Sequence, residues 1–178
     1  MRRHRVGGDH RPDPPPPPPL KDMAEVIEMR LEWARARFAD PRYASDIASP
    51  ESIKDAERVL DVLLRSTTIR HVLHADLQAK NILHGPDGWF AIDPLGAVDD
   101  LNAEAAALWV AVQDGPTSIQ RRLEELHGHE ALDPDRLTAW TFVLSVAEYR
   151  PYLPASARRI EHFLARTDPD ELISRIPV

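Results

Sequence analysis

The sequence predicts a mainly α-helical fold that carries a small β-hairpin element near its middle. Apolar residues recur at helical spacing on both sides of the middle of the chain, and Asp-Pro and Ser-Pro pairs stand where helices would begin or end. A short run rich in β-branched residues and a turn-rich tetrapeptide interrupt this pattern between residues 69 and 93. Because strands do not alternate with helices along the chain, a doubly wound parallel sheet is excluded.

The first part of the chain, residues 1–20, is not expected to join the fold. It contains six consecutive prolines, which favour an extended polyproline helix, and four arginines. We therefore expect a disordered, basic, Pro-rich tail that is either a flexible leader or the product of a mis-assigned start codon. A ligand for a proline-recognition domain is the alternative.

Two amphipathic helices follow the tail. The first is predicted over residues 21–39 and ends at Asp40-Pro41, since the residue before a proline disfavours helix. The second begins at Ser49-Pro50, where serine can cap the helix and proline can take its first position. Helical spacing assigns the following residues to the two apolar faces: Met23, Val26, Ile27, Leu31, Ala34, Phe38, Ile53, Ala56, Leu60, Leu63 and Leu64.

The middle of the chain is predicted to form strands. Residues 69–74 are rich in β-branched and apolar side chains and are predicted as a short strand. Residues 81–84 and 89–93 flank a Gly-Pro-Asp-Gly tetrapeptide, residues 85–88, and this arrangement is typical of a β-hairpin.

Helices return after the hairpin. Asp99 or Asp100 can cap a helix that starts at Leu101, and Asp133-Pro134 can begin a longer one. Two shorter helices are predicted over residues 154–166 and 168–176. Three tryptophans lie on the apolar faces of predicted helices and are expected in the core: Trp33, Trp109 and Trp140.

Composition restricts the expected partners. The net charge is −7, and the residues after the first twenty together carry −9. An acidic body repels phosphate backbones, so we expect no nucleic acid and favour a cationic small molecule, although acidity can also serve solubility alone. No apolar run of about 18 residues exists, so no membrane association is expected. The chain has no cysteine, which excludes disulfides and thiolate metal sites and fits a reducing, cytoplasmic location.

Four polar residues, His74, Asp76, Asn81 and Asp93, are crowded among short apolar runs. The first three have the spacing H-x-D-L-x-x-x-N. In phosphoryl-transfer enzymes an aspartate at this place orients the acceptor hydroxyl, and the asparagine five residues later binds magnesium. A hairpin between Asn81 and Asp93 would bring two oxygen ligands together, a small set that suits Mg²⁺.

Two alternatives remain open for this cluster. The aspartates can cap turns while His74 is a buried, hydrogen-bonded histidine. A transition metal held by His71, His74 and Asp76 is the second alternative, although no further ligands stand nearby.

The segment from residue 72 to residue 106 resembles the catalytic segment of aminoglycoside phosphotransferases. The branch that contains streptomycin kinases and hydroxyurea phosphotransferases is the most similar, through the pieces HADLQAKN, AIDPLG and DDLNAE. The resemblance extends over roughly residues 20–147. It implies a kinase-like fold, ATP and Mg²⁺ as cofactors, and a hydroxylated, cationic small molecule as the acceptor.

The resemblance also implies roles for individual residues. Asp76 matches the catalytic base, and His74 matches a loop histidine whose role is more structural than chemical. Asn81 and Asp93 match the magnesium ligands that hold the nucleotide. An acidic pair, Asp100 and Glu104, follows the metal loop, and a structural role is favoured for it over contact with a cationic acceptor.

Three positions depart from the pattern of that branch. Ala75 stands where glycine is usual, and a positive φ there would cost about 1 kcal/mol. Leu95 replaces a lysine and Gln78 replaces a histidine. The groups expected to orient the acceptor and bind magnesium are nevertheless present.

We further expect residues 21–178 to be the C-terminal lobe of a kinase-like fold without its N-terminal lobe. The chain has three lysines, and none lies in a strand-like run that precedes a helix. The predicted function is an ATP-dependent phosphotransferase with an alcohol acceptor, of the aminoglycoside and hydroxyurea resistance type, in truncated form. The alternatives are an inactive, pseudokinase-like remnant that binds nucleotide weakly or a protein partner, and an unrelated helical metal-dependent hydrolase. An exposed lobe interface would permit self-association.

Overall fold

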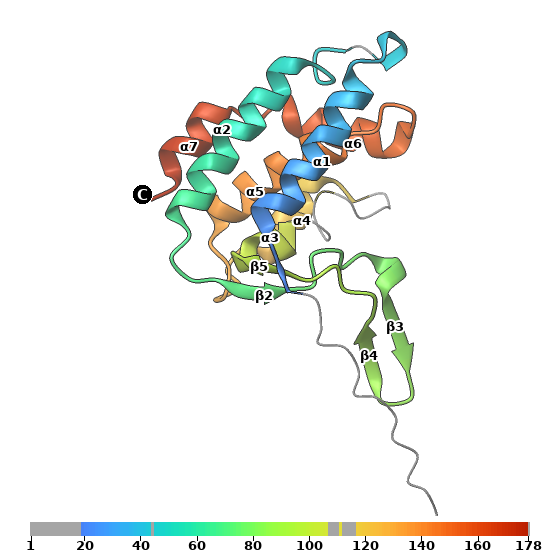
Figure 1. Ribbon diagram of the computed structural model, residues 1–178, viewed down its shortest axis with the longest axis vertical. Helices are drawn as coiled ribbons and strands as arrows, with labels where there is room; N and C mark the ends of the chain where they lie inside the picture. The colour runs from blue at the N-terminus through green and yellow to red at the C-terminus, as the bar shows by residue number, and fades with distance from the viewer. Residues whose placement is uncertain (1–18, 44, 107–110, 112–116, 178) are drawn as a thin grey trace, which may run out of the picture.

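The architecture is a helical body with two small β elements at one end. A computed structural model of the chain describes residues 19–43, 45–106, 111 and 117–177. Figure 1 shows two long helices side by side over a central helix, and a hairpin that projects away from the body. These three helices are α1 (Met23–Phe38), α2 (Pro50–Ser66) and α5 (Pro134–Glu148). The mainly helical prediction is confirmed.

The central helix, α5, is buried on almost every side. It packs against α1, α2 and the remaining described helices, so its sequence is apolar around most of its circumference rather than along one stripe. The remaining described helices are α3 (Leu101–Ala105), α4 (Ile119–Leu126), α6 (Pro154–Leu164) and α7 (Pro169–Arg175), with a 3₁₀ turn, η1, at Pro41–Tyr43. The sequence did not predict α4.

Polar side chains cap several helices at or near the positions that the sequence predicts. Ser49 caps α2 by accepting a hydrogen bond from the backbone N–H of Ser52, and Asp133 caps α5 by accepting from two backbone N–H groups. Asp100, rather than Asp99, caps α3. Asp22 caps α1, so this helix starts two residues later than predicted.

A three-stranded sheet joins segments that are far apart in the sequence. Its strands are β1 (Lys21–Asp22), β2 (His71–Leu73) and β5 (Ala97–Asp99). β5 is central and pairs parallel with β1 and antiparallel with β2. The prediction placed a strand at β2 but missed the other two, because strands of two or three residues carry too little periodicity to recognise.

The predicted hairpin is confirmed. Its strands are β3 (Ile82–Gly85) and β4 (Gly88–Ala91), which pair from Ile82 with Ala91 to Gly85 with Gly88. A short 3₁₀ turn, η2 (Ala79–Asn81), leads into it.

The prediction that tryptophans are core residues is only partly correct. Trp140 is fully buried, whereas Trp33 is 54% exposed and Trp109 lies outside the described residues. The buried stripe of α1 runs through Met23, Val26, Ile27, Arg30, Leu31, Ala34 and Phe38, and Trp33 falls beside it. Packing in the core therefore does not account for the presence of a tryptophan at position 33.

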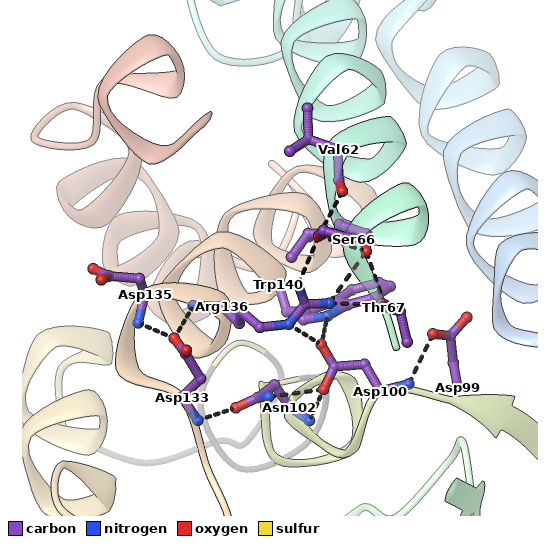
Figure 2. A network of polar contacts seen from close by, with 11 residues as sticks. Val62, Ser66, Thr67, Asp99, Asp100, Asn102, Asp133, Asp135, Arg136 and Trp140 are labelled. Atoms are coloured by element: carbon purple, nitrogen blue, oxygen red, sulfur yellow. Dashed lines mark hydrogen bonds and ion pairs between the residues drawn. The ribbon is translucent and has the colours of Figure 1, made fainter. Parts of the chain in front are cut away.

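A buried ion pair connects the start of α3 to α2 and α5 (Figure 2). One oxygen of Asp100 accepts hydrogen bonds from the backbone and side-chain nitrogens of Asn102. The other accepts from Arg136 Nε at 2.7 Å and Trp140 Nε1 at 2.9 Å. Arg136 also donates to the last turn of α2, where it binds Ser66 Oγ, Leu63 O and Thr67 Oγ1.

Within the described residues, no helix combines the length and hydropathy that a membrane span needs. The predicted tail is residues 1–20, of which residues 1–18 lie outside the described residues.

Candidate active site

The loop after β2 contains a residue in the left-handed region. Ala75 has φ of 61° and is buried, so the backbone conformation that glycine would adopt freely is imposed on alanine. Its N–H donates to Glu104 Oε2 at 3.0 Å, which ties the loop to α3. Ala75 therefore has the positive φ that the sequence analysis associated with backbone strain at this position.

Asp76 follows this strained residue and is surrounded by donors. Gln78 Nε2 donates to one carboxylate oxygen at 2.6 Å, and Asn81 Nδ2 donates to the other at 3.0 Å. Lys80 Nζ lies 3.3 Å from that second oxygen. Burial raises the pKa of Asp76, but the hydrogen bonds from Gln78, Lys80 and Asn81 together lower it by more than burial raises it. The pKa of Asp76 therefore lies below its ordinary value. Asp76 is therefore an anion at neutral pH.

The hairpin brings the chain back to Asn81. Ile92 N donates to Asn81 O at 2.9 Å, one step beyond the last rung of the β3–β4 ladder. Asp93 comes next, exposed and with φ of 58°, a conformation that aspartate tolerates better than most residues. The expected approach of the two hairpin ends is thus present in the backbone.

His74 joins the two loops through both of its ring nitrogens. Its Nδ1 accepts from the backbone N–H of Asp76 at 3.3 Å, so the proton is assigned to Nε2, which lies 2.9 Å from Ile92 O. The carbonyl oxygen of His74 accepts from Gly96 N at 3.1 Å. These contacts fix the Asp76 loop against the loop that carries Asp93.

Sequence reasoning missed Arg30, a buried arginine on α1 that is 7% exposed. It donates to Ala75 O at 3.2 Å and to Glu148 Oε1 at 2.7 Å, and its Nη2 lies 3.7 Å from Asp76 Oδ1. It was detectable in principle, because it occupies a position on the apolar stripe of α1. Glu148 was not, since 118 positions separate the two residues.

Replacing Arg30 with methionine is expected to destabilise the protein by about 2 kcal/mol, because Ala75 O loses its donor while Glu148 keeps its pair with Arg150. Urea denaturation followed by circular dichroism measures this change. Arg35→Met is the matched control on the same helix, since Arg35 pairs with Glu57 at the surface, a contact worth about 0–1 kcal/mol. Equal losses in the two variants would contradict the assigned role of Arg30.

A pocket of about 310 Å³ opens beside these residues. It is lined by Met29, Arg30, Trp33, Asp76, Asp93, Pro94 and Leu95. Cavities of about 390 and 700 Å³ lie elsewhere, but neither has Asp76 or Asp93 in its lining. The smaller pocket is therefore the candidate active site.

The oxygen groups at this pocket fit a magnesium ion better than a transition metal. Among the described residues, no three histidine, aspartate or glutamate side chains are grouped so that they could hold a metal by themselves, so the site at His71, His74 and Asp76 is not supported. Mg²⁺ is typically bound by one or two protein carboxylates, with water and phosphate oxygens as the other ligands. Asp93 is exposed beside the pocket, and its carboxylate suits that donor set.

The acidic pair that follows is engaged within the protein. Asp100 is 6% exposed and bound to Arg136, while Glu104 holds Ala75 N. The Glu104 contact stabilises the Asp76 loop, whereas the Asp100 pair joins α3 to α2 and α5. Both carboxylates therefore have structural contacts, which is the role favoured from the sequence.

Comparison with known proteins identifies the family of the chain. A sequence model of the aminoglycoside/hydroxyurea antibiotic resistance kinases matches residues 8–149, which include β1 to β5 and helices α1 to α5. No curated protein and no solved structure gives a significant match. The match covers most of the chain, which therefore belongs to the family of aminoglycoside/hydroxyurea antibiotic resistance kinases.

Proposed function

We propose that residues 21–178 form a kinase-like C-terminal lobe that transfers the γ-phosphate of ATP to an alcohol group of a small antibiotic. The observation that carries this proposal is the meeting of Asp76, Asn81 and Asp93 around one hairpin, with Asp76 and Asp93 lining one pocket. Membership of a kinase family supports ATP and a divalent metal as the general cofactors, and a small antibiotic as the acceptor.

In the proposed mechanism Asp76 accepts a hydrogen bond from the acceptor hydroxyl and takes its proton as the oxygen attacks the γ-phosphorus of ATP. The bond from the γ-phosphorus to the bridging β-phosphate oxygen breaks in the same step, and ADP leaves. Its lowered pKa keeps it ionised, and Gln78 and Asn81 fix the direction of its carboxylate. Catalysis then depends on positioning and electrostatics rather than on a covalent intermediate.

Asn81 and Asp93 are the proposed magnesium ligands. Asn81 is buried and its Nδ2 donates to the carbonyl oxygen of Asp76 at 2.7 Å, which fixes the amide and leaves its oxygen as the ligand atom. When bound, Mg²⁺ would neutralise charge that develops on the phosphate oxygens. Asp93 would supply the negative charge of the site, since Asn81 is neutral.

The assignment of Asp93 is tested with the Asp93→Asn variant, because asparagine tolerates the left-handed backbone while it lacks the charge. Mg·ATP at about 100 times its dissociation constant should stabilise the parent by about 2.7 kcal/mol. At the same concentration we expect most of this stabilisation to be lost in the variant. Thermal unfolding with and without Mg·ATP measures the effect.

Asp87→Asn is the matched control, since Asp87 lies exposed in the turn of the same hairpin. It should respond to Mg·ATP as the parent does. Equal stabilisation of parent and Asp93→Asn would refute Asp93 as a ligand, and a parent that Mg·ATP does not stabilise would refute the nucleotide site.

A further inference from the structure

Trp33 is placed where an acceptor could rest on it. Its indole is 54% exposed although it belongs to α1, whose neighbouring residues Arg30 and Ala34 are buried. Trp89, the other exposed tryptophan among the described residues, contacts His84 edge to face, with ring centroids 4.8 Å apart. Trp33 instead lines the pocket that contains Asp76 and Asp93. An exposed aromatic face that lines a pocket beside a few polar groups is typical of a small-molecule site.

The pocket has an apolar side and an acidic side. Met29, one helical turn before Trp33, and Leu95 supply apolar surface together with the indole. Before metal and nucleotide bind, Asp76 and Asp93 supply negative charge to this pocket. The positive charge of Arg30 is committed to Glu148 and the Asp76 loop, and Lys80 pairs with Asp76 from outside the pocket lining. Leu95, at a position where the resembled branch has lysine, adds no positive charge. The surface presented to an acceptor is thus aromatic and negative.

Such a surface suits a cation that also carries a ring and a hydroxyl group. An indole face attracts ammonium or guanidinium groups and covers the C–H face of a ring. The pocket volume of about 310 Å³ is at the lower end for small-molecule sites, enough for one ring of a larger molecule. Hydroxyurea, which is small, neutral and without a ring, would leave the indole uncovered.

We propose that Met29, Trp33 and Leu95 form the acceptor subsite, and that it takes a cationic, ring-bearing alcohol stacked on the indole of Trp33. This inference rests on the proposed function, because it assumes that the phosphorylated hydroxyl lies at Asp76. It names Trp33 as a residue that sets specificity between the two kinds of antibiotic in the family's description.

The test is isothermal titration of the full chain with streptomycin, in the absence of nucleotide. Trp33→Ala should weaken binding by about tenfold, and Trp33→Phe, which keeps an aromatic face, by about threefold at most. Trp89→Ala removes another exposed indole, which is outside the pocket lining, and should bind as the parent does. Circular dichroism confirms that each variant is folded.

Two further ligands separate the contributions of charge and ring. Sucrose, a neutral molecule with rings, and hydroxyurea should both bind the parent much more weakly than streptomycin does. The inference is overturned if the parent does not bind streptomycin, if Trp33→Ala binds it as tightly as the parent, or if sucrose binds equally well. Streptomycin binding that depends on Trp33, in a protein that Mg·ATP fails to stabilise, would uphold the subsite and refute the proposed function.

Discussion

Replacing Asp100 with asparagine should lower the free energy of unfolding by about 3–5 kcal/mol, because it breaks a buried ion pair and leaves one charge without its partner. One carboxylate oxygen already accepts two hydrogen bonds from Asn102, so the asparagine oxygen would take that place. Its amide group would then face two donors, Arg136 Nε and Trp140 Nε1. Arg136 is largely buried and would lose its carboxylate.

Urea denaturation at pH 7 measures this loss. Asp135→Asn is the control, since Asp135 is half exposed and lies 3.9 Å from Arg175, and it should change stability by about 0.5 kcal/mol at most. A loss below about 1 kcal/mol in Asp100→Asn would contradict the buried pair as a principal support of the fold.

The pH dependence of that loss has a definite sign. Burial raises the pKa of Asp100, but the hydrogen bonds from Asn102 and Trp140 and the charge of Arg136 together lower it by more than burial raises it. The pKa in the folded protein therefore lies below the pKa in the unfolded chain. The stability that the ionised carboxylate contributes is therefore complete above the unfolded pKa of about 4 and is lost as the pH falls through the folded value. The difference in the free energy of unfolding between the parent and Asp100→Asn should stay constant from pH 5 to 8 and become smaller below about pH 4.

Replacing Asp76 with asparagine should lower the rate of phosphate transfer by about 10²–10⁴-fold, the usual contribution of a positioned general base. Asparagine is close to the same size but cannot accept the proton of the acceptor hydroxyl. Since Asp76 is not among the proposed magnesium ligands, the affinity for Mg·ATP should change by about threefold at most. Steady-state kinetics together with nucleotide titration separates the two quantities.

Asp87→Asn serves again as the control and should keep the parent's rate. A fall in rate that only reflects weaker Mg·ATP binding would contradict the role of Asp76 as base. Unchanged kinetics in Asp76→Asn would refute it outright.

Local signals in the sequence predicted the hairpin and the described helices other than α4. The caps at Ser49 and Asp133 and the turn at residues 85–88 depend on neighbouring residues, which the sequence displays directly. The sheet of β1, β5 and β2 depends on pairing between distant segments, and its strands are too short to show alternation. Trp33 was misassigned because hydrophobicity was taken as burial, although helical spacing alone places it beside the stripe.

The candidate site was predictable to the extent that it lies within one continuous segment. The spacing of His74, Asp76 and Asn81 and the hairpin before Asp93 predict the residues that we propose for it, and the backbone brings the hairpin ends together as expected. Arg30 reaches the site from α1, whose contact with this loop no local pattern reveals. The positive φ of Ala75 follows from the surrounding loop, since alanine itself disfavours that conformation.

The central claim is that this chain carries a phosphotransfer site directed at a small cationic alcohol. The most direct measurement is transfer of radiolabelled γ-phosphate from Mg·ATP to streptomycin by the full chain, compared with its Asp76→Asn variant. We predict labelled streptomycin with the parent, loss of most labelling in the variant, and no labelling when EDTA removes the metal. Binding of Mg·ATP by the parent without any transfer above the level of Asp76→Asn would contradict the claim and favour a lobe that binds nucleotide without catalysing transfer.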